Sequence, residues 1–207
     1  DFSKKNLFNK GYKFSLIEFL NLLSSRIDIF MLSVLTDPVS LGVYALANTI
    51  SRKGLIIRRA IQQPLFPHYS NKTINKNSFR MLNKHFLLIS MASTFIVLII
   101  YFLSDKVIPF IVGDEFMYSS EILKVLAFYL LFHYAVMPFS TFIEAQKHES
   151  LALKIGAFRA SINLICNLLF FNLFGIIGIA YSTVLVWALN FLFFYILSFK
   201  TIHYALK

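Results

Sequence analysis

Long stretches without a charged side chain, separated by short polar segments, set the pattern of this chain. Neither the stretch between Lys84 and Asp105 nor that between Lys124 and Glu144 contains an Asp, Glu, Lys or Arg. A third uncharged stretch follows Arg159 and is about twice as long. Because an α-helix needs about 20 apolar residues to cross a bilayer, each of the first two stretches predicts one transmembrane helix.

The third stretch extends to Lys200 and is interrupted at 172–175, where Asn and Gly favour a turn. It therefore predicts two transmembrane helices joined by a tight turn. Pro138 lies inside the helix predicted between Lys124 and Glu144, and we expect it to kink that helix or end its straight part.

The first 70 residues contain two further stretches of spanning length, both interrupted by charges. The first runs from residue 14 to residue 36 and ends at Asp37-Pro38, because proline disfavours a helical conformation in the residue before it. The second begins at Ser40, and Pro64 and Pro67 mark its end. Together the patterns predict an all-α integral membrane protein, a six-helix bundle with spans at 14–36, 40–66, 85–104, 120–143, 151–171 and 176–199 between tails at 1–13 and 200–207.

The composition agrees with this class and fits several others poorly. Of the 207 residues, 57% are hydrophobic and 14% are charged, against about 45–50% and about 25% in average globular chains. An ordinary cytosolic enzyme, a disordered segment and a secreted disulfide scaffold would not have this composition. The single cysteine, Cys166, lies in an apolar run, and the sequence shows no metal-ligand spacing and no glycine-rich phosphate loop. We therefore expect no metal, no cofactor and no catalytic residue.

The net charge of the chain is +10, and the distribution of its basic residues predicts the orientation of the helices. The basic residues lie in short clusters between apolar runs rather than over a soluble surface, which argues against nucleic-acid binding. The tails, a polar loop predicted at 71–84 and the 145–150 turn are basic, whereas Asp37 and a loop predicted at 105–119 form an acidic side. Because cytoplasmic segments of membrane proteins are enriched in Lys and Arg, both termini are predicted to be cytoplasmic.

Four charged residues of the first two predicted helices lie near the middle of the membrane. At about 1.5 Å per residue, Arg26 and Asp28 lie about 18 and 21 Å into the first helix, and Arg52 and Lys53 about 18 and 20 Å into the second. Ionisable groups at this depth usually face a protein interior or a water-filled cavity. We expect Asp28 to neutralise Arg52 or Lys53, which leaves net positive charge for an anion.

Other polar residues allow more than one role. Arg59 lies about 20° from Arg52 around the helix and extends the same stripe, but Arg58, Arg59 and Arg159 also fit side chains that reach the lipid headgroups. Glu18, Asp28 and His133 are candidates for ion coupling, and His133 fits a hydrogen-bonded structural histidine as well. Asn163, Asn167 and Asn190 are expected to form hydrogen bonds between helices.

Several short segments occur in a recognisable order: 28–33, 39–45, 64–70, 112–116, 163–167 and 174–180. In this order and spacing they resemble the C-terminal half of Wzx-type O-antigen and polysaccharide flippases. In that family an intramembrane Asp precedes a "vGiYa" segment, and two later helices carry "N…N" and "yGiiGaa". The resemblance covers nearly the whole chain.

The resemblance implies a fold and a function. The family belongs to the multidrug/oligosaccharidyl-lipid/polysaccharide exporter superfamily, in which two six-helix lobes surround a central cavity. It implies translocation of a polyprenyl-diphosphate-linked oligosaccharide across the bacterial inner membrane by alternating access, for polysaccharide and lipopolysaccharide biosynthesis. Its implied partners are membrane lipids, an N-terminal six-helix half and polysaccharide polymerase machinery. Arg26, Asp28, Arg52, Lys53 and Arg59 fall where a cationic cavity would be lined.

Three alternatives remain open at the level of sequence. A multidrug/cation antiporter of the same superfamily would prefer a net acidic cavity, and a peptidoglycan-precursor flippase would use cationic residues too. A membrane-embedded glycosyltransferase would need grouped acids in a loop, of which 105–121 offers several without a supporting basic or aromatic cluster. Six predicted spans against about twelve in the family indicate one lobe of a longer protein or a naturally short chain.

Overall fold

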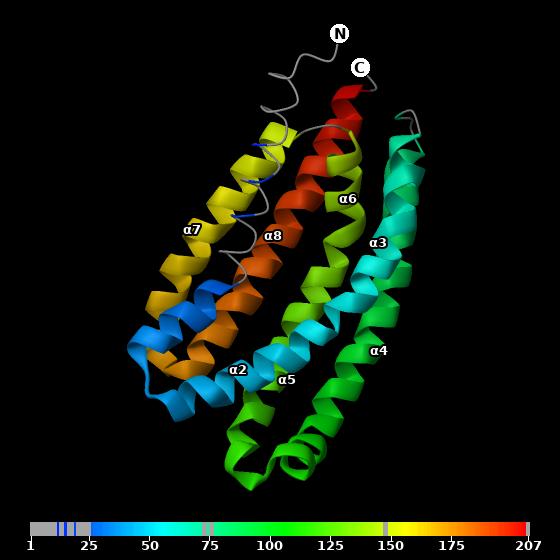
Figure 1. The fold of residues 1–207 in the computed structure, drawn as a ribbon. Coiled ribbons are helices and arrows are strands. Elements are labelled where there is room, and N and C mark those ends of the chain that lie inside the picture. The colour runs from blue at the N-terminus through cyan, green and yellow to red at the C-terminus, as the bar shows by residue number, and fades with distance from the viewer. Residues whose placement is uncertain are drawn as a thin grey trace.

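The computed structural model describes residues 12, 15, 19, 26–71, 74, 77–146 and 149–205, and every regular element within these ranges is helical. Figure 1 shows an elongated bundle in which the long helices run side by side. Residues 26–35 form a helix that precedes α2. The elements that follow are α2 (Pro38–Lys53), α3 (Leu55–Ser70), α4 (Ser78–Val112), the 3-10 turn η1 (Asp114–Phe116), α5 (Met117–Ala135), α6 (Met137–Ala145), α7 (Glu149–Phe174) and α8 (Ile176–Ala205).

The start of α2 is determined by Asp37 and Pro38. The Asp37 carboxylate accepts hydrogen bonds from the backbone N–H groups of Val39 (2.9 Å) and Ser40 (3.0 Å). Pro38 lies in the first turn of α2. A backbone N–H in the first turn has no intrahelical acceptor, so the N–H that proline lacks costs no hydrogen bond. The predicted boundary at Asp37-Pro38 is therefore confirmed. Part of the helix predicted at 14–36, including Glu18, lies outside the described residues.

The prediction of a single helix at 40–66 is wrong, because Gly54 divides this segment into α2 and α3. The hydroxyl of Tyr134 donates a hydrogen bond of 2.5 Å to the Gly54 carbonyl. A Cβ atom at Gly54 would lie 3.1 Å from a methyl group of Leu130, so only glycine packs here without displacement. Pro64 and Pro67 lie inside α3 instead of ending it.

Helix α4 extends beyond both of its predicted ends. Residues 78–84 and 105–112, expected in polar loops, are helical. At about 1.5 Å per residue α4 is about 52 Å long, which exceeds a hydrocarbon core of about 30 Å. Asp105 does not end the helix, because its carboxylate pairs with Lys124 of α5 at 2.5 Å and accepts a hydrogen bond from Ser120 at 2.8 Å.

The helix predicted at 120–143 is divided into α5 and α6 at Val136. Pro138 occupies the first turn of α6, and the backbone N–H of Val136 donates to the Phe132 carbonyl at 3.0 Å. The expected effect of Pro138 on this helix is confirmed.

A tight turn at Gly175 joins α7 to α8, as predicted. Gly175 has φ +66°, a left-handed conformation that glycine adopts without steric cost. Three residues later, a Cβ atom on Gly178 would overlap the carbonyl oxygen of Phe170 and lie 2.6 Å from its carbonyl carbon. The two backbones therefore approach so closely that α8 requires glycine at 178.

Four helical stretches within the described residues are long and apolar enough to cross a membrane: Ser78–Val112, Asp114–Ala145, Lys154–Phe174 and Ile176–Tyr204. The chain is thus an all-α membrane protein, while the two N-terminal spans of the predicted six-helix bundle are not among these four. The exposed side chains of α4, α7 and α8 form an apolar outer surface that includes Leu88, Met91, Phe95, Ile165, Leu168, Leu192, Phe193 and Ile196.

The two ends of the bundle differ in charge. In Figure 1 the end of α3, the start of α7 and the end of α8 lie together, opposite the turn before α2, the α4–α5 connection and the α7–α8 turn. Among the described residues, the first end carries Arg80, Lys84, Lys154 and Lys200 together with Glu144, and the opposite end carries Asp37, Asp105, Lys106, Asp114 and Glu115.

We predict that Gly178→Ala lowers the thermal unfolding temperature of the detergent-purified protein. The added methyl group forces α7 and α8 apart, and overpacking of this kind costs about 1–3 kcal/mol. Gly42→Ala is the matched control, because a Cβ atom there meets nothing within 4 Å. Equal melting temperatures for the two variants would contradict the close backbone contact.

Candidate functional site

Basic side chains occupy the middle of the helical path formed by α2 and α3. Lys53 lies about 22 Å along this path from Pro38 and about 25 Å from Ser70. Lys53 and Arg59 are exposed, and Arg52 is half-buried. A charged side chain facing lipid at such depth costs several kcal/mol, so these residues favour contact with water or with another protein surface.

A buried carboxylate lies behind these residues. Asp28 is 6% exposed, and three side chains donate to it: Asn167 at 3.1 Å, Tyr44 at 3.3 Å and Thr183 at 3.4 Å. Ser182 in turn donates to the amide oxygen of Asn167. The network joins the 26–35 helix to α2, α7 and α8, and we name it the Asp28 network.

The Asp28 network compensates for the removal of a carboxylate from water. An isolated buried carboxylate is strongly destabilising, and hydrogen bonds from an amide and hydroxyl groups recover part of that cost. Arg52 is close enough to act electrostatically on Asp28 and Tyr44, as a smaller contribution at Asp28 than the hydrogen bonds from Asn167 and Tyr44. Of the two cations expected to neutralise Asp28, Arg52 is half-buried while Lys53 is exposed.

A second polar group lies between α3, α5, α7 and α8. The Arg159 guanidinium is 5.0 Å from the centre of the Trp187 ring, a cation–π distance. The His133 ring lies 3.9 Å from the Trp187 ring and 5.3 Å from that of Tyr129. Arg58 acts electrostatically on both Tyr129 and His133. We name Arg58, Tyr129, His133, Arg159 and Trp187 the arginine–aromatic cluster.

Two buried atoms of the arginine–aromatic cluster lack a hydrogen-bond partner within the described part of the chain. They are the Nε atom of Arg58 and the Nδ1 atom of His133. The buried amide oxygen of Asn163, one turn along α7 from Arg159, also lacks a hydrogen-bond partner within the described residues. Buried polar atoms are usually satisfied, so such a group indicates a place where a further polar ligand or water binds.

The residues predicted from the sequence are thus distributed over different environments. Arg52 is close enough to act electrostatically on Asp28, His133 lies in the arginine–aromatic cluster, and Arg26, Lys53 and Arg59 are exposed. Their role in substrate binding stays a prediction. The expected helix–helix hydrogen bonding of Asn167 is confirmed.

The environments of Arg58 and Arg159 differ from those predicted from the sequence. Both were expected to reach the headgroups, but the Arg58 Nε atom is buried and Arg159 lies over Trp187. For Arg159 a signal was present, because residues 159, 163 and 167 repeat every four positions and share one face of α7. For Arg58 there was no comparable signal, since the break at Gly54 changes the direction of α3.

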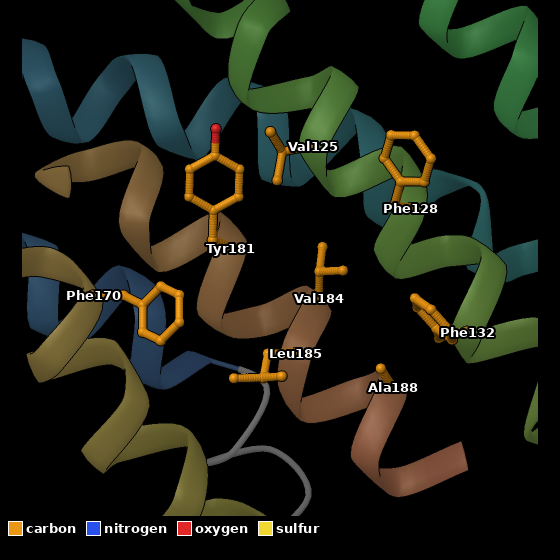
Figure 2. Close-up of a pocket in the computed structure, with 8 residues that line it drawn as sticks. All are labelled: Val125, Phe128, Phe132, Phe170, Tyr181, Val184, Leu185 and Ala188. Atoms are coloured by element: carbon orange, nitrogen blue, oxygen red, sulfur yellow. The ribbon is translucent and has the colours of Figure 1, made fainter. Parts of the chain in front are cut away.

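An apolar groove shares no lining residue with either polar group. It has a volume of about 450 Å³ and is lined by side chains from α5, α7 and α8. Figure 2 shows its lining residues, Val125, Phe128, Phe132, Phe170, Tyr181, Val184, Leu185 and Ala188. Within the described residues there is no group of three or more His, Cys, Asp or Glu that could hold a metal ion.

Comparison with known proteins identifies the family. Residues 3–121, more than half of the chain, match the family described as "Polysaccharide biosynthesis protein". The chain belongs to this polysaccharide biosynthesis family. It is also 23% identical over 191 residues to a protein of Haloferax volcanii named "Probable low-salt glycan biosynthesis flippase Agl15".

The match to the Haloferax volcanii protein covers 90% of this chain and 40% of the relative. The chain thus spans well under half of that relative's length. No solved structure matches the chain at a significant level.

We predict that Asn167→Ala destabilises this family member by about 1–3 kcal/mol, because a buried carboxylate loses its amide donor. The measurement is thermal unfolding in detergent at neutral pH. Asn172→Ala is the matched control, since Asn172 is exposed on the same helix. If both variants unfold at the wild-type temperature, the Asp28 network does not stabilise the bundle.

Proposed function

We propose that this protein translocates a polyprenyl-diphosphate-linked oligosaccharide across the bacterial inner membrane by alternating access, for surface polysaccharide biosynthesis. The observation that carries the proposal is the placement of Arg52, Lys53 and Arg59 midway along the α2–α3 path in a polysaccharide biosynthesis family member. The flippase name of the Haloferax volcanii relative supports the same activity.

The chemistry of such a substrate explains why cations are needed. Its glycan and diphosphate are too polar for hydrocarbon, while its lipid tail can stay in the bilayer. Attraction between opposite charges is several-fold stronger in a partly buried site than in bulk water. Arg26, Arg52 and Lys53 carry three positive charges against the one negative charge of Asp28, so an excess of positive charge is available for the diphosphate.

The cavity of the proposed transporter requires a second surface opposite the exposed Lys53 and Arg59. We propose that this surface belongs to an N-terminal six-helix half, and that the 26–35 helix and the α2–α3 path complete a six-helix lobe here. Both termini of this lobe are then cytoplasmic, in agreement with the basic end of the bundle. Polysaccharide polymerase machinery would use the translocated product.

Ion coupling is assigned in this proposal to Asp28. It is a buried carboxylate in contact with three helices, and a change in its charge would alter the hydrogen bonds that hold α2, α7 and α8 together. A proton or a small cation bound at Asp28 would therefore favour one arrangement of these helices over another. His133 and Glu18 are further candidates for the coupling group.

The first test is deletion of the complete gene, followed by extraction of lipids and staining of surface polysaccharide. We expect loss of surface glycan and accumulation of lipid-linked repeat units. In a complementation assay, Arg52→Ala is expected to lower surface glycan at least about tenfold, the loss given by about 1.4 kcal/mol of missing attraction. Arg80→Ala, an exposed arginine at the basic end of α4, is the control and should complement fully.

Normal surface glycan in the deletion strain, with new sensitivity to cationic dyes, would favour a multidrug/cation antiporter and overturn the proposal. Accumulation of a peptidoglycan precursor instead of a polysaccharide repeat unit would identify a peptidoglycan-precursor flippase. Full complementation by Arg52→Ala would contradict the assignment of the cationic residues while leaving the activity in place.

We predict opposite accessibility for cysteines placed at the two ends of the bundle. In a cysteine-free background that includes Cys166→Ser, Glu115→Cys should react with an impermeant maleimide in intact spheroplasts. Tyr204→Cys, 71% exposed at the other end, should react only after permeabilisation. The reverse pattern would place the termini on the outer side of the membrane.

A further inference from the structure

The apolar groove between α5 and α8 faces away from the α2–α3 path. Phe128 of α5, which lines the groove, lies about 180° around the helix from Ser119, and the Ser119 hydroxyl donates to a carbonyl group of α2 at 2.8 Å. On α8, Leu185 lines the groove about 160° from Thr183, a member of the Asp28 network. Phe128 and Leu185 are 45% and 39% exposed, so the groove that Figure 2 shows opens toward the bilayer.

The groove begins where the hydrocarbon of the membrane ends. The uncharged stretch 85–104 of α4 is about 30 Å long, which is one hydrocarbon thickness, and Asp105 follows it directly. Lys124, the ion-pair partner of Asp105, therefore lies at headgroup depth. Lys124, Phe128 and Phe132 share one face of α5 over about 12 Å, close to the depth of one leaflet, about 15 Å.

Ring contacts connect the Asp105–Lys124 ion pair to the groove. The Lys124 Nζ atom is 5.6 Å from the centre of the Tyr101 ring, a cation–π distance. The Tyr101 ring in turn lies 6.3 Å from the ring of Phe128, edge to face. A continuous surface thus extends from a charged pair at headgroup depth into an apolar groove within the hydrocarbon.

The ion pair presents both signs of charge to its surroundings. The side chains of Lys124 and Asp105 are 25% and 46% exposed. Lys124 donates to Asp105, and Ser120 donates to the other carboxylate oxygen at 2.8 Å. An ammonium group has three donors and a carboxylate accepts about four hydrogen bonds, so each partner can bind a further group of opposite charge. The pair is neutral as a whole, which favours a ligand that carries one charge of each sign.

We propose that the apolar groove and the Asp105–Lys124 pair bind a zwitterionic phospholipid of the phosphatidylethanolamine type. One acyl chain lies in the groove along Phe128 and Phe132. A phosphate oxygen accepts a hydrogen bond from Lys124, and the ammonium group of the headgroup donates to Asp105. Tyr101 offers a ring face beside the same charges.

This site goes beyond the proposed function, because it lies on the opposite side of α5 from the α2–α3 path with its exposed Lys53 and Arg59. The bound phospholipid is a component of the surrounding membrane and not the transported substrate. A neutral ion pair also lacks the excess of positive charge that a diphosphate would require.

The experiment titrates the purified full-length protein in detergent with dioleoyl phosphatidylethanolamine or dioleoyl phosphatidylglycerol, and native mass spectrometry measures the fraction with bound lipid. We expect the wild type to bind phosphatidylethanolamine about tenfold more tightly than phosphatidylglycerol, which corresponds to about 1.4 kcal/mol. Lys124→Gln should weaken phosphatidylethanolamine binding about tenfold. Lys124→Arg keeps the charge and should retain binding.

Asp105→Asn is expected to change the preference instead of the affinity alone. It removes the acceptor for the ammonium group and leaves Lys124 unopposed, so the variant should prefer phosphatidylglycerol. A merely structural role of the ion pair would weaken the binding of both lipids equally. Lys106→Gln is the matched control, since Lys106 is an exposed cation next to Asp105, and it should bind both lipids as the wild type does.

A second pair of variants tests the groove. Ala188→Phe places a ring in the space that the acyl chain would occupy, and should weaken phosphatidylethanolamine binding by about tenfold. Ala92→Phe is its control, because Ala92 is exposed on α4 and does not line the groove. The melting temperature without added lipid checks the fold of each variant.

Equal affinity of the wild type for the two phospholipids, or no loss in Lys124→Gln, would overturn the headgroup assignment. Unchanged binding in Ala188→Phe would overturn the assignment of the acyl chain to the groove. Displacement of phosphatidylethanolamine by an equal concentration of undecaprenyl phosphate would show that the groove takes a polyprenyl chain, and would contradict a phospholipid site. These results are independent of the gene-deletion assay, in which failure of the proposed function appears as normal surface glycan.

Discussion

The burial of the Asp28 carboxylate is the interaction on which the arrangement of the other helices depends. Hydrocarbon offers no hydrogen-bond partner, so each donor must come from the protein itself. Tyr44, Asn167 and Thr183 supply those donors from three different helices, and Arg52 is close enough to act electrostatically on the carboxylate. A shift of α2, α7 or α8 would leave this carboxylate with fewer hydrogen bonds. The network therefore stabilises the positions of these helices, and it links the charge of Asp28 to those positions.

Two glycines determine how the polar groups reach one another. Gly178 lets the backbones of α7 and α8 approach closely, which brings Asn167 and Ser182 together. Gly54 ends α2 against Leu130, and its carbonyl is taken by Tyr134, so α3 begins in a new direction with Arg58 four residues later. Small residues at helix contacts thus allow the approach that the polar contacts require.

Prediction from sequence succeeded where local chemistry decides the outcome. Asp37-Pro38 and Gly175 ended helices as expected, because capping and left-handed backbone conformation are properties of a few adjacent residues. It failed where packing decides. The break at Gly54 depends on Leu130 and Tyr134 of α5, and the continuation of α4 through Asp105 depends on Lys124. Each of these partners is remote in the chain.

The sequence by itself determined the all-α membrane class and the charge difference between the ends, because both follow from the hydropathy and charge of individual residues. Only the tertiary structure decided which cations lie near which acids. Arg159 lies over the Trp187 ring and the Nε atom of Arg58 is buried, whereas Arg59, beside Arg58, is exposed. The physical reason is that a side chain's environment depends on the direction of its helix, which here follows from contacts at Gly54 and Gly178 that no local pattern records.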